Sequence, residues 1–188
     1  MGYFDVKLFT ALARLAEQRL PDFNPQELVN TAWAFAVANF YLDRLIGPQF
    51  THRCNMVVWS NVDAQRGLCQ LHQWALWHWE LRQPLPFLPA LRNRCLAAFL
   101  AARSTTSQTE RKVAAALMEL GGQPKGDVII TEGFSIDLIA LWKGKQVALE
   151  FDGPSHFLTG LHSATGATLL KHRQLHALGW QLAVVPYW

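Results

Sequence analysis

The first hundred residues carry hydrophobic side chains at helical spacing, separated by proline-containing breaks. From residue 4 to residue 20 hydrophobic side chains recur every three or four positions, which predicts an amphipathic helix that Pro21 ends. A second helix is predicted to begin after Asn24, whose side chain can cap it, with Pro25 at the first helical position and Glu27 in the first turn. The pattern therefore predicts a helical N-terminal part.

Two further helices are predicted at about residues 63–81 and 91–102. The sequence Trp74-Ala75-Leu76-Trp77 in the first of them echoes Trp33-Ala34-Phe35-Ala36, 41 residues earlier. That offset lies in the range of helical-pair repeats. Two copies are also what two unrelated amphipathic helices would produce, so the pattern alone leaves both interpretations open.

The hydrophobic period changes after a polar cluster at residues 104–107, which we take as the domain boundary. Ser107 and Glu110 form a capping-box pattern at the start of a helix. Two strands follow, at residues 134–142 and 146–152, then a helix at about 168–178 and a closing strand at 180–186. The predicted fold class is α + α/β, with a helical repeat-like region at residues 1–103 and a small α/β domain at 104–188.

Acidic side chains interrupt the hydrophobic alternation of the 146–152 strand. Glu150 and Asp152 lie two positions apart, so they share one face of the strand. If Lys143 pairs with Gln146 across the hairpin, Asp137 lies opposite Asp152. Any turn of even length keeps all three carboxylates on one face, and like charges this close need a proton, a metal or a cation.

This acidic corner has two interpretations. A Mg²⁺-dependent phosphodiesterase would use Asp137, Glu150 and Asp152 to hold the metal, with a lysine to orient the water. Such enzymes carry that lysine two residues after the glutamate, where this chain has Asp152, so Lys171 could serve only from another element. In the structural interpretation Asp152-Gly153-Pro154 forms a turn and a neighbouring group satisfies His156.

Composition narrows the classes of function only slightly. The 188 residues are 51% hydrophobic, with 8 Trp and 11 Phe, so some aromatic side chains are available for binding. A net charge of +3 and a pI near 8.9 are compatible with RNA but do not demonstrate it. No hydrophobic run reaches the roughly 18 residues of a membrane span. The N-terminus lacks the layout of a secretory signal or a transit peptide, so import signals are absent or the chain is a mature or partial product.

Three cysteines, Cys54, Cys69 and Cys95, are widely spaced and show no Cys-x-x-Cys pattern. This usage predicts reduced, mostly buried thiols rather than a disulfide framework or a metal site.

Several separated motifs in the C-terminal third resemble the RAP domain family. They are Asp137-Leu138, residues 147–157 with Asp152-Gly153-Pro154-Ser155-His156, residues 166–173, Gly179-Trp180, and Val185-Pro186-Tyr187-Trp188. The order and spacing agree over about residues 127–188, and residues 107–121 and 132–137 resemble the segment that precedes the domain. Upstream, residues 25–36 and 71–74 are similar to degenerate helical repeats of the organellar octotricopeptide- or heptatricopeptide-like kind.

The resemblance implies an organellar RNA-binding protein, in the mitochondrion or alternatively a plastid. It further implies a mitochondrial ribosome-associated subunit that binds rRNA beside other ribosomal or ribonucleoprotein subunits, and a fold similar to small restriction-endonuclease-like domains. The missing lysine argues against hydrolysis, so we expect no metal or other cofactor, with Mg²⁺ only in the nuclease alternative. A third alternative is a protein-interaction subunit that uses the Trp-rich helix with Trp74, Trp77 and Trp79.

For RNA contact the strongest predicted residues are Lys171, His172 and Arg173, near a helix N-terminus where backbone N–H groups also favour phosphate. The weaker candidates are His156, Arg111 and Lys112. The alternative for the 171–173 cluster is a solvated helix face.

Overall fold

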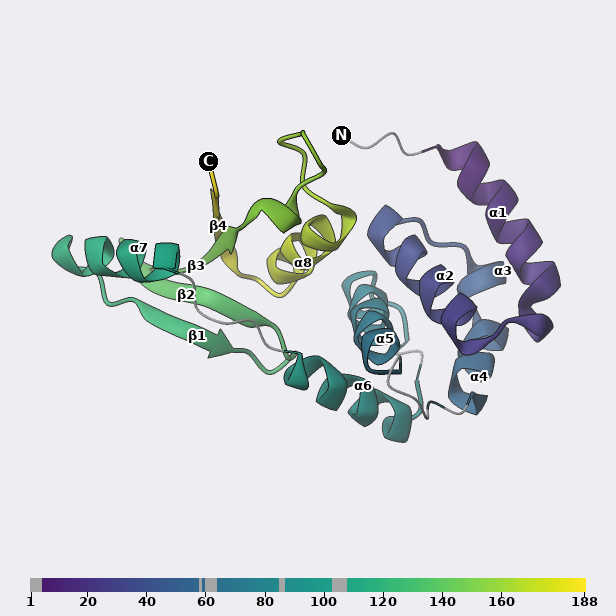
Figure 1. Ribbon diagram of the computed structural model, residues 1–188. Helices are drawn as coiled ribbons and strands as arrows, with labels where there is room; N and C mark the ends of the chain where they lie inside the picture. Colours follow the sequence, from purple (N-terminus) through teal and green to yellow (C-terminus); the bar gives the residue numbers. More distant parts are fainter. Residues whose placement is uncertain (1–4, 58, 60–63, 85–86, 103–107) are drawn as a thin grey trace. The chain divides into compact units, whose positions relative to one another are not determined.

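The computed structural model describes residues 5–57, 59, 64–84, 87–102 and 108–188. The chain divides into two compact units, Met1–Ala102 and Arg103–Trp188 (Figure 1). The first unit is helical, and the second combines helices with a four-stranded sheet. The expected fold class, α + α/β, is therefore confirmed.

The first unit is a series of helices joined by short connections. Their bounds are Val6–Arg19 (α1), Leu20–Asp22 (η1), Pro25–Ala38 (α2), Asp43–Ile46 (α3), Pro48–Met56 (α4), Ala64–Glu80 (α5) and Pro89–Ala101 (α6). The cap of α2 is as predicted: the Asn24 side chain accepts from the N–H of Glu27, and the Glu27 carboxylate accepts from the N–H of Asn24. Among the described residues no helix is both long and hydrophobic enough to cross a membrane.

The two Trp-containing helices, α2 and α5, pack against each other. Trp33 Nε1 donates to Gln73 Oε1 at 3.0 Å, and Trp77 Nε1 donates to Asn39 Oδ1 at 2.8 Å. Trp74 and Trp77 are fully buried, whereas Trp79 is 46% exposed. Two of the three tryptophans of α5 therefore belong to the core. Of the three tryptophans considered for a protein partner, Trp79 is the one exposed to solvent.

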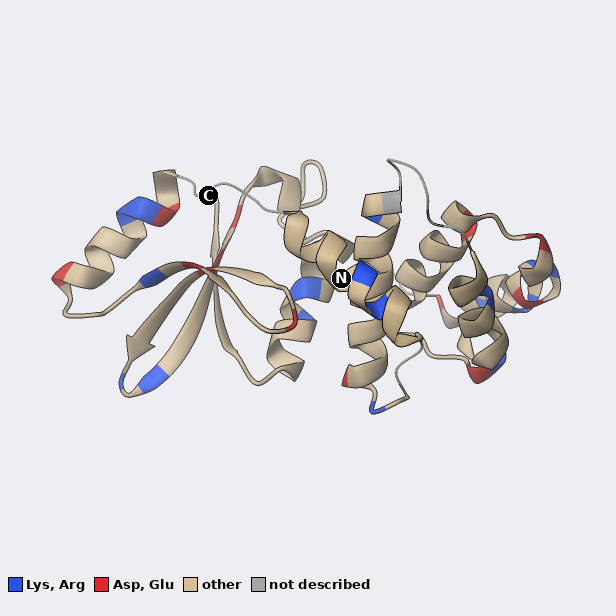
Figure 2. Cartoon of the chain, turned by 90° about the horizontal axis from the view of Figure 1, so that it is seen from below, with Lys and Arg blue, Asp and Glu red and all other residues tan. Residues whose placement is uncertain are grey.

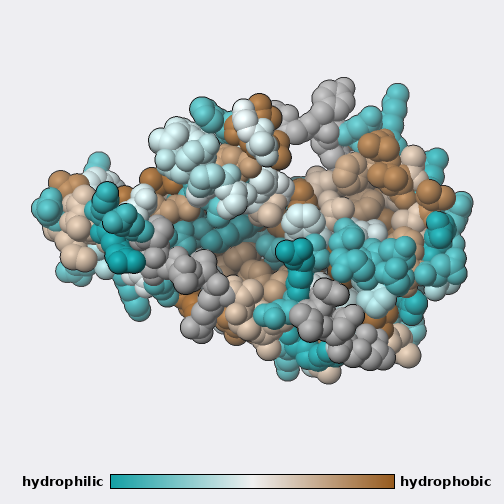
Figure 3. Space-filling view, in the orientation of Figure 1, coloured by the Kyte–Doolittle hydropathy of each residue, from teal (hydrophilic) through white to brown (hydrophobic). Residues whose placement is uncertain are grey.

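The hydrophobic stripe of α1 does not lie where the sequence pattern suggested. The helix is present, but Leu8, Leu12 and Leu15 are each about half exposed, and Ala13 is the buried position. Phe9 makes an edge-on ring contact with Phe35 at 5.5 Å, which turns the leucine positions away from α2. Figure 3 shows hydrophobic side chains at the surface over this helix.

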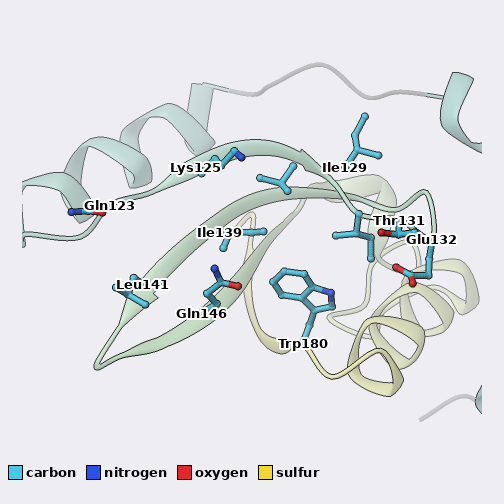
Figure 4. Close-up of a pocket in the computed structure, with 11 residues that line it drawn as sticks. Gln123, Lys125, Ile129, Thr131, Glu132, Ile139, Leu141, Gln146 and Trp180 are labelled. Carbon is cyan, nitrogen blue, oxygen red and sulfur yellow. The ribbon is translucent and has the colours of Figure 1, made fainter.

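The second unit contains a mixed sheet in the order β1-β2-β3-β4. Its elements are Gln108–Glu119 (α7), Lys125–Ile129 (β1), Ser135–Trp142 (β2), Lys145–Asp152 (β3), Pro154–His156 (η2), Gly166–Ala177 (α8) and Gln181–Pro186 (β4). The first three strands are antiparallel, and β4 runs parallel to β3 after α8. The helices α7 and α8 lie on opposite sides of the sheet (Figure 4).

Strand β1 was not predicted from the sequence. It is an edge strand with Gly126 and Asp127 in its middle, and Asp127 has a positive φ of 49°. Four of its five residues are exposed, so it carries no alternation of hydrophobic and polar side chains. The capping box predicted at Ser107 lies outside the described residues.

The predicted register of the β2–β3 hairpin is wrong by two positions. Trp142 pairs with Lys145, so the turn is the two residues Lys143 and Gly144, both at positive φ (48° and 76°). A two-residue turn with both residues at positive φ matches the right-handed twist of the flanking strands. Asp137 consequently lies across from Glu150, not from Asp152. The turn has even length, as assumed, so the three carboxylates share one face.

All three cysteines are free. Cys54 and Cys95 are fully buried and Cys69 is partly buried. Burial raises the pKa of the Cys95 thiol to about 12 and raises the pKa of Cys54 further. The prediction of reduced, mostly buried thiols is confirmed.

Candidate nucleic-acid interface

The C-terminal ends of β3 and β4 lie side by side because these two strands are parallel. The chain leaves β3 at Asp152, passes through η2, and enters α8 at Thr165, whose hydroxyl accepts from the N–H of Thr168 at 3.3 Å. In sheets with parallel strands, ligands characteristically bind at this carboxyl end. This edge of the second unit is therefore the place to look for a site.

Glu150 forms the buried centre of the acidic corner. Its side chain is 1% exposed and is ion-paired with Lys171, which reaches down from α8. Oε1 of Glu150 is buried without a hydrogen-bond partner. Burial raises the pKa of Glu150 to about 7, against the opposing effect of the Lys171 ammonium.

Asp152 is held by two histidines. Nδ1 of His156 lies 2.8 Å from Oδ1 of Asp152, and Nε2 of His172 lies 3.4 Å from Oδ2. Burial alone would raise the pKa of Asp152, but hydrogen bonding and charge from the two imidazoles outweigh it, and the pKa is lowered. The Asp152 carboxylate thus lies between the two imidazoles, with His156 as its hydrogen-bond partner.

Asp137 completes the corner through the backbone. Its Oδ2 accepts the N–H of Phe151 at 2.8 Å, at the point where the pairing of β2 with β3 ends. The Asp137 carboxylate thus accepts the hydrogen bond that a backbone carbonyl of β2 would accept if the pairing of β2 with β3 continued. Burial raises the pKa of Asp137 despite this hydrogen bond.

These partners bear on the nuclease alternative. Each of the three carboxylates is engaged by a different internal group: a lysine, a pair of histidines and a backbone amide. Within the part of the chain that the structure describes, no group of three His, Cys, Asp or Glu side chains is placed to hold a metal ion. The expectation of no metal at the acidic corner stays a prediction, and we derive no hydrolytic step from it.

The predicted RNA contacts divide into two sets. Lys171, His172 and His156 meet at the acidic corner, where only His156 has a substantially exposed side chain (39%). Arg173 is partly buried on α8, and Arg111 and Lys112 are exposed on α7. The sequence placed the first three near the carboxylates correctly. Their role in RNA binding stays a prediction, as does that of Arg173, Arg111 and Lys112.

An aromatic cluster at the same edge was not identified as a site from the sequence. We call Phe157, His162, Tyr187 and Trp188 the aromatic edge. The His162 and Trp188 rings are stacked at 4.2 Å, and Phe157 contacts Trp188 at 4.6 Å. Tyr187 and Trp188 are each 54% exposed. The available signal was two large aromatic residues directly after Pro186, past the end of a strand and so without a place in the core.

The comparisons with known proteins match this part of the chain. A chloroplastic RAP domain-containing protein from Oryza sativa subsp. japonica is 32% identical over 82 residues. That alignment covers 44% of this chain but only 12% of the relative. The RAP domain family model matches residues 149–188, a narrower span than the 127–188 expected, and does not reach the upstream helices. The predicted helical repeats therefore stay a prediction. Residues 149–188, which include the acidic corner from Glu150 onward and all of α8, form a RAP domain.

Proposed function

We propose that the second unit binds single-stranded organellar RNA and that the aromatic edge is its principal contact. The observation that carries this proposal is the exposure of Tyr187 and Trp188 at the carboxyl end of two parallel strands, within the RAP domain. Unstacked bases bind to exposed aromatic rings with little dependence on sequence. The stacked His162–Trp188 pair holds one of these rings in place.

The neighbouring charges favour a polyanion at this edge. Glu150 and Asp152 are only 1% and 2% exposed, with Lys171 against the first and His156 and His172 against the second. The acidic corner consequently presents little negative charge to a phosphate. Its role in this proposal is to fix η2, which carries His156, and α8, because the loop with His162 connects these two elements.

The organelle and the target are further parts of the proposal. The sequence resemblance favoured a mitochondrial ribosome, but the relative is a chloroplastic protein, and the comparisons give the mitochondrion no support. We infer a plastid location, with organellar ribosomal RNA as the expected target and ribosomal subunits as neighbours. A fluorescent fusion of the complete gene product tests the compartment, and sequencing of RNA crosslinked to the native protein tests the target.

Binding to RNA is tested with fluorescein-labelled single-stranded oligonucleotides and the full chain. Changing Tyr187 and Trp188 together to alanine should weaken binding at least about tenfold at 0.15 M salt, because a stacked base contributes roughly 1–3 kcal/mol. Trp79→Ala is the matched control, since it removes another indole that is about half exposed, from the helical unit. Equal affinities for the wild-type protein and the double variant would contradict the proposal.

Binding is proposed to need no metal, because the three carboxylates have internal partners. We expect EDTA to leave the dissociation constant unchanged and the RNA to stay intact in Mg²⁺ or Mn²⁺. Cleavage that Glu150→Ala abolishes would instead support the nuclease alternative. Cleavage that survives this substitution would point to a contaminant.

A further inference from the structure

The RAP-containing unit has a recess whose lining residues do not include Glu150 or Asp152. It has a volume of about 600 Å³ and is formed by β1, β2 and the connection between them, the start of β3, and Trp180 just before β4. Figure 4 shows Ile139, Gln146 and Trp180 close together beneath β2, with Lys125 on β1 above them. Its volume falls within the range of small-ligand sites, roughly 300–1,000 Å³.

Trp180 lines this recess, and its main chain is held by the end of α8. The N–H of Trp180 donates to the carbonyl of Leu175 at 3.1 Å, and the N–H of Gly179 donates to that of His176 at 2.9 Å. Together with the left-handed φ of 91° at Gly179, these two bonds form the capping motif that ends α8. These bonds fix the main chain at Trp180, and the partly buried indole lines one side of the recess.

The other side chains suit a nucleobase with its phosphate. Ile139 supplies an apolar surface, and the amides of Gln123 and Gln146 can each donate and accept hydrogen bonds, as the edges of bases require. Lys125 lines the recess, and Figure 2 shows further basic residues at the β2–β3 hairpin, where Lys143 is exposed. Glu132 lies at the far end from Gln123, so a phosphate belongs beside Lys125.

We propose that this recess binds one unstacked nucleotide of the RNA, with its base against Trp180, its edge at Gln146 and its phosphate at Lys125. The inference rests on the proposed RNA binding and adds a second contact, on the helix-free part of the sheet face. A strand of RNA that spans the aromatic edge and the recess would be read at both, with Gln146 as the residue that selects the base.

The first test is positional and uses the unaltered full chain. A single-stranded RNA carrying 5-iodouridine is crosslinked by light, and the crosslinked peptides are identified by mass spectrometry. We expect crosslinks at Trp180 in addition to those at Tyr187 or Trp188. Crosslinks at the aromatic edge alone would overturn the recess and leave the proposed function intact. An absence of RNA binding altogether would overturn both.

Substitutions supply the quantitative test. Trp180→Ala should weaken RNA binding about tenfold, and Trp180→Phe should restore most of the affinity. Trp142→Ala is the matched control. This indole, on the β2–β3 hairpin, is 48% exposed but does not line the recess. Circular dichroism and thermal melting establish that each variant is folded.

Gln146→Leu keeps the size of an exposed side chain and removes only its hydrogen bonds. Across twelve-residue oligo(A), oligo(C), oligo(G) and oligo(U), it should reduce the differences in affinity by about threefold or more. Unchanged preferences together with unchanged affinity of Trp180→Ala would overturn the proposal. Loss of a co-purifying protein from the Trp180→Ala variant, with RNA binding intact, would assign the recess to a protein partner and would likewise overturn it.

Discussion

Glu150 has an unusual position for a carboxylate, since one of its oxygens meets Lys171 and the other is buried without a partner. Its raised pKa of about 7, from burial, makes the folded protein bind a proton that the unfolded chain releases above about pH 4.5. The contribution of Glu150 to stability is therefore complete at about pH 4.5 and below, and is lost as the pH rises towards 7.

The prediction concerns the difference in melting temperature between the wild-type protein and Glu150→Gln. The variant mimics the protonated carboxyl at every pH, so its melting temperature relative to wild type should rise between pH 5 and pH 8. Differential scanning fluorimetry at several pH values measures this. The comparison also cancels the opposite pH effect of His78, whose pKa burial lowers to about 4. A constant difference across that range would show that Glu150 does not titrate there.

At the scale of elements, the sequence predicted those with strong local signals. The Asn24 capping box and the Trp-containing helices α2 and α5 were placed correctly because their hydrophobic spacing and cap chemistry are local. Strand β1 was missed because it is short, exposed and pairs only with β2. The stripe of Leu8, Leu12 and Leu15 predicted helix α1 correctly but not its buried side, which depends on where Phe9 meets Phe35.

The hairpin turn offers a test at this scale. Lys143 has φ 48°, a conformation that asparagine adopts more readily than lysine in two-residue turns. Lys143→Asn should raise the free energy of unfolding by roughly 0.5 kcal/mol. Gly144→Ala, at φ 76°, should lower it by about 1 kcal/mol, with nothing within 4 Å to clash. Urea titration measures both, and a change of the same sign in the two variants would contradict the turn assignment.

At the scale of the molecule, the exposed tryptophans report where RNA lies. Trp79, Trp142 and Trp188 are each about half exposed, whereas Trp74 and Trp77 are fully buried. Hydroxyl-radical footprinting should oxidise the first three in the free protein and spare the last two. Saturating single-stranded RNA should protect Trp188 and leave Trp79 as reactive as before. Protection of Trp79 without Trp188 would place the RNA on the helical unit.

Sequence alone determined the class of each half of the chain, the Asn24 cap, and the RAP resemblance of the C-terminal part. These follow from local spacing and from motifs that are contiguous in the chain. The tertiary structure decided how the charges are used. A two-residue turn set the register that brings Asp137 across from Glu150, and the return of α8 over β3 placed Lys171 and His172 on the carboxylates.

The same packing placed the predicted acidic and basic residues against one another, with Glu150 and Asp152 buried. It also left Tyr187, Trp188 and the recess beside Trp180 accessible to solvent. No local pattern carries this information. Whether a charged or aromatic side chain faces a partner or the solvent depends on residues that lie far away in sequence and meet it only in the folded protein.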